Sequence, residues 1–176
     1  LALNVYHRVR IIKPQSAEAY NNIGTILHSL GRQNEACQLY ETSVQLNPEI
    51  AETWANLGNI YRETDNHKKA IEYYNKALEL NPDMQETAFN IAMLHYSSSN
   101  YREAIKYFRA NDSELSQTHL LRCLFECGDD IRFKKQLQYV RDKGYINALI
   151  GSTICRAGVI NQTSSFNPFL RSSYWQ

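Results

Sequence analysis

Apolar residues recur along most of the chain at intervals of three and four residues, the spacing that gathers them on one face of an α-helix. The clearest face combines a large, an apolar, a small and an aromatic residue: Trp54, Leu57, Gly58 and Tyr61. A matching face follows in the next segment, with small and aromatic residues at Ala70, Tyr74 and Ala77. Because Gly58 and Ala70 have little or no side chain, two helices can cross closely there. The pattern therefore predicts a pair of packed helices.

This pair repeats along the chain with a 34-residue period. Pro14, Pro48 and Pro82 mark the period at a constant spacing, and proline ends a helix because it cannot continue one. The face of the first helix returns one period earlier and one period later, at Tyr20, Ile23, Gly24 and Leu27 and at Ala88, Ile91, Ala92 and His95. The turns between helices fall at positions that need left-handed or capped backbone: Gly31, Asp65-Asn66 and Ser99-Asn100.

The period and the order of residue sizes resemble the tetratricopeptide repeat, a helix–turn–helix unit of this length. The match is complete in the middle unit and decays after Phe108. The resemblance implies an all-α fold, a right-handed superhelical solenoid of helical hairpins. It divides the chain into the second helix of a truncated repeat, two full repeats and a divergent repeat, over residues 1–14, 15–48, 49–82 and 83–112. Because the first of these lacks its first helix, we expect the chain to be a fragment.

The rest of the chain predicts a degenerate helical hairpin with a capping helix over 113–158, then an extended tail or linker over 159–176. Helices are expected at 113–127, 130–143 and 145–156. The run from Ser165 to Phe169 resembles the junction at which tetratricopeptide repeats lead into an iron- and 2-oxoglutarate-dependent oxygenase domain. That resemblance implies that such a domain would follow Gln176.

Charge and composition exclude some classes of binding partner. A formal net charge of +1 argues against nucleic acid, which calls for a strong basic excess. No segment approaches the ~20 consecutive apolar residues of a membrane span, so no membrane is expected as a partner. The four cysteines form no CxxC pair, which favours free thiols in a reducing, cytoplasmic compartment.

No group of residues indicates catalysis. The sequence has no Gly-rich phosphate loop, nucleophile elbow or HExxH motif. None of its histidines has an acidic residue two positions on, as the iron site of such an oxygenase requires. His119, Cys123 and Cys127 recur every four residues, but the outer two lie ~12 Å apart along a helix, too far to share one metal. We therefore expect no metal, no cofactor and no enzymatic activity in this segment, and leave open whether a longer protein is an enzyme.

Asparagine recurs at one position of the 34-residue repeat. Asn22, Asn56 and Asn90 follow one another at the repeat period on the first helices, which line the concave face of this fold. An asparagine side chain both donates and accepts hydrogen bonds, so a row of them could bind the backbone of an extended peptide at regular intervals. The row resembles the asparagine ladder in the repeat arm of O-linked N-acetylglucosamine transferase. The alternative is that each asparagine bonds to a neighbouring helix.

Neighbouring positions complete the predicted groove. The polar ones selected as contacts are Asn21, Asn59 and Arg62, and the apolar ones are Phe89, Met93 and Tyr96. The groove positions thus change from polar to apolar along the array, which suggests a partner with a polar stretch and one hydrophobic anchor. Glutamate also recurs at the repeat period, at Glu18, Glu52 and Glu86. These residues could form an acidic groove edge, but glutamate in the first turn of a helix is favoured by the macrodipole, which is the interpretation we prefer.

Three functions follow. The leading one is a protein–protein interaction module that binds an extended peptide or protein segment in the groove. The second is a non-catalytic substrate-recognition arm of a larger enzyme, either a glycosyltransferase or a 2-oxoglutarate oxygenase. The third is a structural scaffold, in which the exposed repeat ends stack on another copy.

Overall fold

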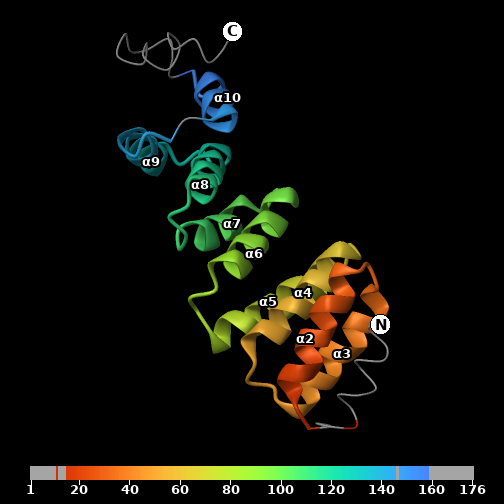
Figure 1. Ribbon diagram of the computed structural model, residues 1–176. Coiled ribbons are helices and arrows are strands. Elements are labelled where there is room, and N and C mark those ends of the chain that lie inside the picture. The colour runs from red at the N-terminus through yellow and green to blue at the C-terminus, as the bar shows by residue number, and fades with distance from the viewer. Residues whose placement is uncertain (1–10, 12–14, 146, 159–176) are drawn as a thin grey trace. The chain divides into compact units, whose positions relative to one another are not determined.

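The computed structural model describes residues 11, 15–145 and 147–158, and the described residues form helices without strands. In chain order the helices are α2 (Ala17–Ser29), α3 (Gln33–Leu46), α4 (Ala51–Glu63), α5 (His67–Leu80), α6 (Gln85–Ser97), α7 (Tyr101–Phe108), α8 (Glu114–Glu126), α9 (Asp130–Asp142) and α10 (Ala148–Arg156) (Figure 1). The predicted fold class, an all-α helical repeat solenoid, is confirmed. The truncated helix at 1–14 and the tail at 159–176 lie outside the described residues.

The chain divides into two compact units, residues 1–91 and 92–176, and the division falls inside α6. In the first unit α2 packs on α3, α3 on α4, and α4 on α5. In the second unit α8 packs on α7, α9 and α10. The repeat boundaries drawn from the sequence stay predictions.

The helices of the first unit cross where the sequence places glycine. A Cβ atom built on Gly24 would lie 2.6 Å from Cε1 of Tyr40, and one built on Gly58 would lie 2.5 Å from Cδ1 of Tyr74. Both tyrosines are fully buried. Each ring therefore occupies the space that a side chain would need, and glycine is the residue that lets the ring and the facing helix meet.

A polar contact joins the two repeats inside the core. Ser43 of α3 and Thr53 of α4 are both fully buried. The Ser43 hydroxyl donates to the carbonyl oxygen of Ala17 at 2.8 Å, and its oxygen lies 3.2 Å from that of Thr53. Buried hydroxyls need such partners because an unmade hydrogen bond costs about 1–3 kcal/mol.

The turn after each first helix needs a left-handed residue, as the sequence predicts. Gly31, Asp65 and Ser99 occupy the same frame position, with φ angles of 75°, 57° and 58°. Glycine adopts this conformation without strain, whereas residues with a Cβ atom are disfavoured there. The first repeat thus uses the favoured residue, and the next two tolerate a disfavoured one.

We expect Asp65→Gly to raise the free energy of unfolding by about 0.5–1 kcal/mol, because it removes that strain. Equilibrium unfolding in urea measures the change. Asn34→Gly, within α3, is the control and should destabilise by about 1 kcal/mol, because glycine weakens a helix interior. A loss of stability at Asp65 would show that its left-handed backbone carries no strain.

The second unit contains the three helices expected after residue 112. α8 and α9 lie within one residue of their predicted limits, but α10 begins at Ala148 and not at Tyr145. The reason is a cap: the Asn147 side chain accepts a hydrogen bond from the backbone N–H of Ile150 at 3.0 Å, which fixes the first turn. The core of this unit contains fully buried Phe108, Leu121 and Val140.

Candidate functional site

The asparagine row lies on the first helix of each repeat, as the repeat period predicts. Asn22, Asn56 and Asn90 are each the sixth residue of their helix, in α2, α4 and α6. Asn22 is exposed, and Asn56 and Asn90 are half-buried. We call the surface carried by α2, α4 and the part of α6 up to residue 91 the first-helix face.

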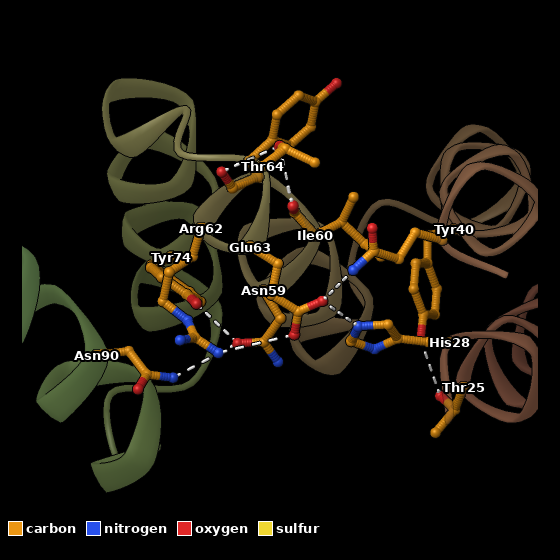
Figure 2. A network of polar contacts seen from close by, with 12 residues as sticks. Thr25, His28, Tyr40, Asn59, Ile60, Arg62, Glu63, Thr64, Tyr74 and Asn90 are labelled. Atoms are coloured by element: carbon orange, nitrogen blue, oxygen red, sulfur yellow. Dashed lines mark hydrogen bonds and ion pairs between the residues drawn. The ribbon is translucent and has the colours of Figure 1, made fainter. Parts of the chain in front are cut away.

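Two of the three asparagines bond across to the preceding first helix. Nδ2 of Asn56 donates to Oδ1 of Asn21 on α2 at 3.0 Å. Nδ2 of Asn90 lies 3.5 Å from Oδ1 of Asn59 on α4, which also accepts from the Tyr74 hydroxyl at 2.7 Å (Figure 2). The difference follows from the sequence, because alanine stands at position 55 where the earlier repeat has Asn21.

Asn22 makes no side-chain hydrogen bond to any residue that the structure describes. Asn56 and Asn90 engage their Nδ2 groups with the neighbouring helix, which leaves the amide oxygen of each for another partner. The inter-helix bonds therefore fix the two amide planes without using up their hydrogen-bonding capacity.

The buried tyrosines reach this face with their polar ends. Tyr40 donates from its hydroxyl to Oγ1 of Thr25 at 3.3 Å, and Tyr74 makes the corresponding contact to Asn59 one repeat later. Burial raises the pKa of the Tyr74 phenol, and the hydrogen bond and charge of Arg62 partly oppose that rise. In the next repeat the two frame positions hold Met93 and Phe108, and neither side chain offers such a contact.

A hollow of about 300 Å³ lies between α4 and α6 within the first unit. It is lined by Asn56, Asn59 and Asn90 from the predicted groove, together with Ala55, Glu52 and Glu86. The structure therefore brings two of the three ladder asparagines to one cavity. Sequence reasoning named both but could not place them on a common hollow.

A second polar cluster lies where α2 and α4 end and α3 begins. Oε2 of Glu63 accepts from Nε2 of His28 at 2.8 Å (Figure 2). The same oxygen accepts from Nε2 of Gln33 at 2.7 Å. Arg62 is exposed, and its guanidinium lies 3.8 Å from the other oxygen of Glu63. The cluster ties α2 and α3 to α4, and of its members only Arg62 was named as a contact residue from the sequence.

Two family descriptions match this part of the chain. A sequence model described as "TPR repeat" matches residues 24–65, and one described as "Tetratricopeptide repeat" matches residues 51–84. Residues 24–84 are tetratricopeptide repeats. Protein binding is the general role of such repeats, so this part of the chain is of a kind that binds proteins or peptides.

Several solved structures share the fold. The chain is 20% identical to one titled "Crystal structure of YrrB: a TPR protein with an unusual peptide-binding site", with a TM-score of 0.72 and coverage of 87% of this chain and 84% of that one. The crystal structure of MamA gives 20% identity, a TM-score of 0.66 and coverage of 80% and 88%. PilF of Pseudomonas aeruginosa is 22% identical to the chain, with a TM-score of 0.68 and coverage of 86% of this chain and 71% of that one. At these identities the likeness concerns the fold.

No curated protein sequence matches the chain. No helix in the described part of the chain is long and apolar enough to cross a membrane. The resemblances to a glycosyltransferase arm and to an oxygenase junction stay predictions, as do the cytoplasmic compartment and the absence of a nucleic-acid partner. Self-association through the exposed repeat ends also stays a prediction.

The predicted apolar contacts are spread over both units of the array. Phe89 belongs to the first unit, and Met93 and Tyr96 belong to the second. The Tyr96 ring packs edge-on against Tyr101 and His119, with centroids 5.7 and 5.2 Å apart. Tyr96 thus contributes to the packing of the second unit, and its role as a hydrophobic anchor stays a prediction.

Another hollow, of about 540 Å³, was missed from the sequence. It lies in the second unit between α8 and α10 and is lined largely by apolar groups, with Leu115, Ala148 and Leu149 among them. His119 also lines it and is the sixth residue of α8, the helix position of the ladder asparagines. Counting from the start of each helix would have found this correspondence, because the 34-residue period does not reach α8.

Within the described residues no group of three histidine, cysteine or acidic side chains could hold a metal ion. Cys123, the middle residue of the row His119, Cys123 and Cys127, is buried in the core of the second unit. Burial raises the pKa of the Cys123 thiol to about 12, so this thiol stays protonated and unreactive at neutral pH.

Proposed function

We propose that the first-helix face binds an extended peptide, and that Asn22, Asn56 and Asn90 hydrogen-bond to its backbone. The observation that carries this proposal is the arrangement of the asparagine amides. Asn56 and Asn90 are held by Asn21 and Asn59, yet each keeps its amide oxygen as an acceptor for a further partner. Side chains that are already ordered lose less conformational entropy when a ligand binds.

The spacing of the row suits an extended ligand. Successive first helices carry one asparagine each at the same helix position, so the amides recur along the array. A peptide backbone also presents alternating donors and acceptors, which such a row can meet without reading side chains. A similar structure is described as a tetratricopeptide protein with an unusual peptide-binding site, which supports peptides as the ligand class.

The proposal assigns this chain no catalytic role. Tetratricopeptide repeats act generally by binding proteins. The groups that line the first-helix hollow are mainly carboxylates and amides, and two of the amides are engaged with neighbouring helices. Binding chemistry therefore accounts for their arrangement.

Asn22→Ala gives the cleanest single test, because Asn22 is exposed and its loss breaks no hydrogen bond between described residues. Peptides selected from a random linear library on the wild-type chain should bind the variant about 2- to 10-fold more weakly, the effect of one lost hydrogen bond. Fluorescence anisotropy measures the change. Thermal unfolding should be unchanged.

Asn34→Ala is the matched control, because Asn34 is an exposed asparagine on the second helix α3. It should leave peptide affinity unaltered. Equal affinity of wild type and Asn22→Ala for every selected peptide would remove Asn22 from the binding surface. A library that yields no peptide for the wild type would remove the proposed function.

A further inference from the structure

The hollow between α4 and α6 has an uncompensated negative charge. Glu52 and Glu86, each the second residue of its helix, both line it. Neither carboxylate forms an ion pair or side-chain hydrogen bond with a residue that the structure describes. The helix macrodipole explains why glutamate is favoured at these positions, but not why two such carboxylates share a cavity.

The basic side chains of the described residues form no part of this cavity's wall. Its described lining contains no lysine, arginine or histidine. The nearest arginine on α4 is Arg62, ten residues after Glu52 and therefore ~15 Å along the helix axis. Arg62 lies beside Glu63 and Tyr74, toward the Asn59 side of the hollow, and is not among the residues that line it.

A hydroxyl in the wall of the hollow also lacks a partner. Thr87 lines the cavity and is 4% exposed. Its counterpart one repeat earlier is Thr53, which pairs with Ser43. Alanine replaces that serine at position 77, so the Thr87 hydroxyl has no hydrogen-bond partner among the described residues. Since no completely buried polar atom of the described part is unpaired, this hydroxyl is accessible, and the opening beside it is the hollow.

The wall also has an apolar part. Ala55 and Met84 line the cavity alongside the amides. A lysine or arginine side chain has the same division, with a hydrocarbon stem that packs on apolar surface and a charged end that seeks oxygen atoms. A volume of about 300 Å³ lies at the lower end of the range of ligand pockets and is suited to a single side chain.

We infer that this hollow receives a lysine or arginine side chain of the bound peptide, with its cation between the carboxylates of Glu52 and Glu86. The stem lies along Ala55 and Met84, and the Thr87 hydroxyl and the Oδ1 atom of Asn56 accept further hydrogen bonds from the cation. The inference rests on the proposed function and adds to it, because the asparagines bind any backbone whereas this hollow selects a basic residue.

The test is a random linear peptide library selected in parallel on the wild-type chain and on the double variant Glu52→Gln/Glu86→Gln. Glutamine keeps the size and removes both charges. The wild type should enrich peptides with lysine or arginine at one position, and the double variant should enrich peptides without that preference. Circular dichroism confirms that both chains are equally helical.

Affinity measurements sharpen the result. In the strongest peptide from the wild-type selection, replacing the enriched basic residue with norleucine should weaken binding to the wild type about 10-fold and leave binding to the double variant nearly unchanged. Binding to the wild type should also weaken as salt is raised, because salt screens exposed charges. The control Glu49→Gln/Glu79→Gln changes the net charge equally at two exposed positions outside the hollow, and should behave as wild type.

The outcomes separate this inference from the proposed function. The inference about the hollow is wrong if the wild type enriches peptides without a basic position, or if the double variant keeps the same preference for a basic residue. In either case the hollow does not bind a cation, and the backbone-binding proposal stands. If the wild type enriches no peptide at all, both proposals fall together.

Discussion

Replacing Gly58 with valine should lower the free energy of unfolding by about 3 kcal/mol or more, the upper range for an overpacked core. A Cβ atom at this position would lie 2.5 Å from both Cδ1 and Cε1 of the Tyr74 ring. The ring cannot swing aside cheaply, because it is fully buried and its hydroxyl donates to Asn59 at 2.7 Å. Gly58→Ala should cost less, since alanine gains about 1 kcal/mol of helix propensity over glycine.

Urea unfolding followed by circular dichroism measures these changes. Gln38→Val is the control for the helix propensity of valine, because Gln38 is exposed within α3, and it should cost less than about 1 kcal/mol. Pairing Gly58→Val with Tyr74→Leu should recover part of the loss, because the smaller side chain vacates the contested space. Strict additivity of the two substitutions would show that the ring is not the obstacle.

The triple variant Asn22→Ala/Asn56→Ala/Asn90→Ala should weaken binding of selected peptides by between about 10- and 2,000-fold. That range is the sum of three lost hydrogen bonds at about 0.5–1.5 kcal/mol each. The same variant should lose about 1–3 kcal/mol of stability, since Asn56 and Asn90 also bond to Asn21 and Asn59. The sequence alone left open whether these asparagines bond to a neighbouring helix, and the structure shows two such bonds.

Asn21→Ala separates the two roles. It breaks the same bond as Asn56→Ala but leaves the Asn56 amide on the surface. We expect similar stability for the two single variants and tighter peptide binding for Asn21→Ala, measured by urea unfolding and fluorescence anisotropy. If the triple variant loses most of its stability and no peptide affinity, the asparagines serve only to hold neighbouring helices.

Local features of this fold could be predicted because each depends on residues close in sequence. The regular spacing of Gly31, Asp65 and Ser99 identified turns that the structure shows to be left-handed. The small residue at Gly58 and the aromatic residue at Tyr74 identified a close crossing, because a helix period fixes which side chains share a face. The start of α10 was misplaced because the capping bond of Asn147 competes with helix propensity.

The candidate site could be predicted only in part. The frame put Asn56 and Asn90 on first helices, but their partners depend on which residue stands on the adjacent helix. Asn21 is present beside Asn56, whereas Ala55 makes Asn90 turn to Asn59. The two hollows depend on side-chain volumes from helices far apart in sequence, and no periodicity within one helix contains that information.

In the first two hairpins, the hydroxyl of the buried tyrosine couples two sequence positions that would otherwise vary independently. Tyr40 reaches Thr25 and Tyr74 reaches Asn59, whereas the third repeat combines Phe108 with Met93. Exchange of one member alone would leave a tyrosine hydroxyl facing a thioether group, or a threonine hydroxyl or asparagine amide facing a phenylalanine ring. When such a repeat is duplicated or diversified, these two positions should therefore change as a pair, and a new binding specificity at the surface position carries with it the choice between tyrosine and phenylalanine in the core.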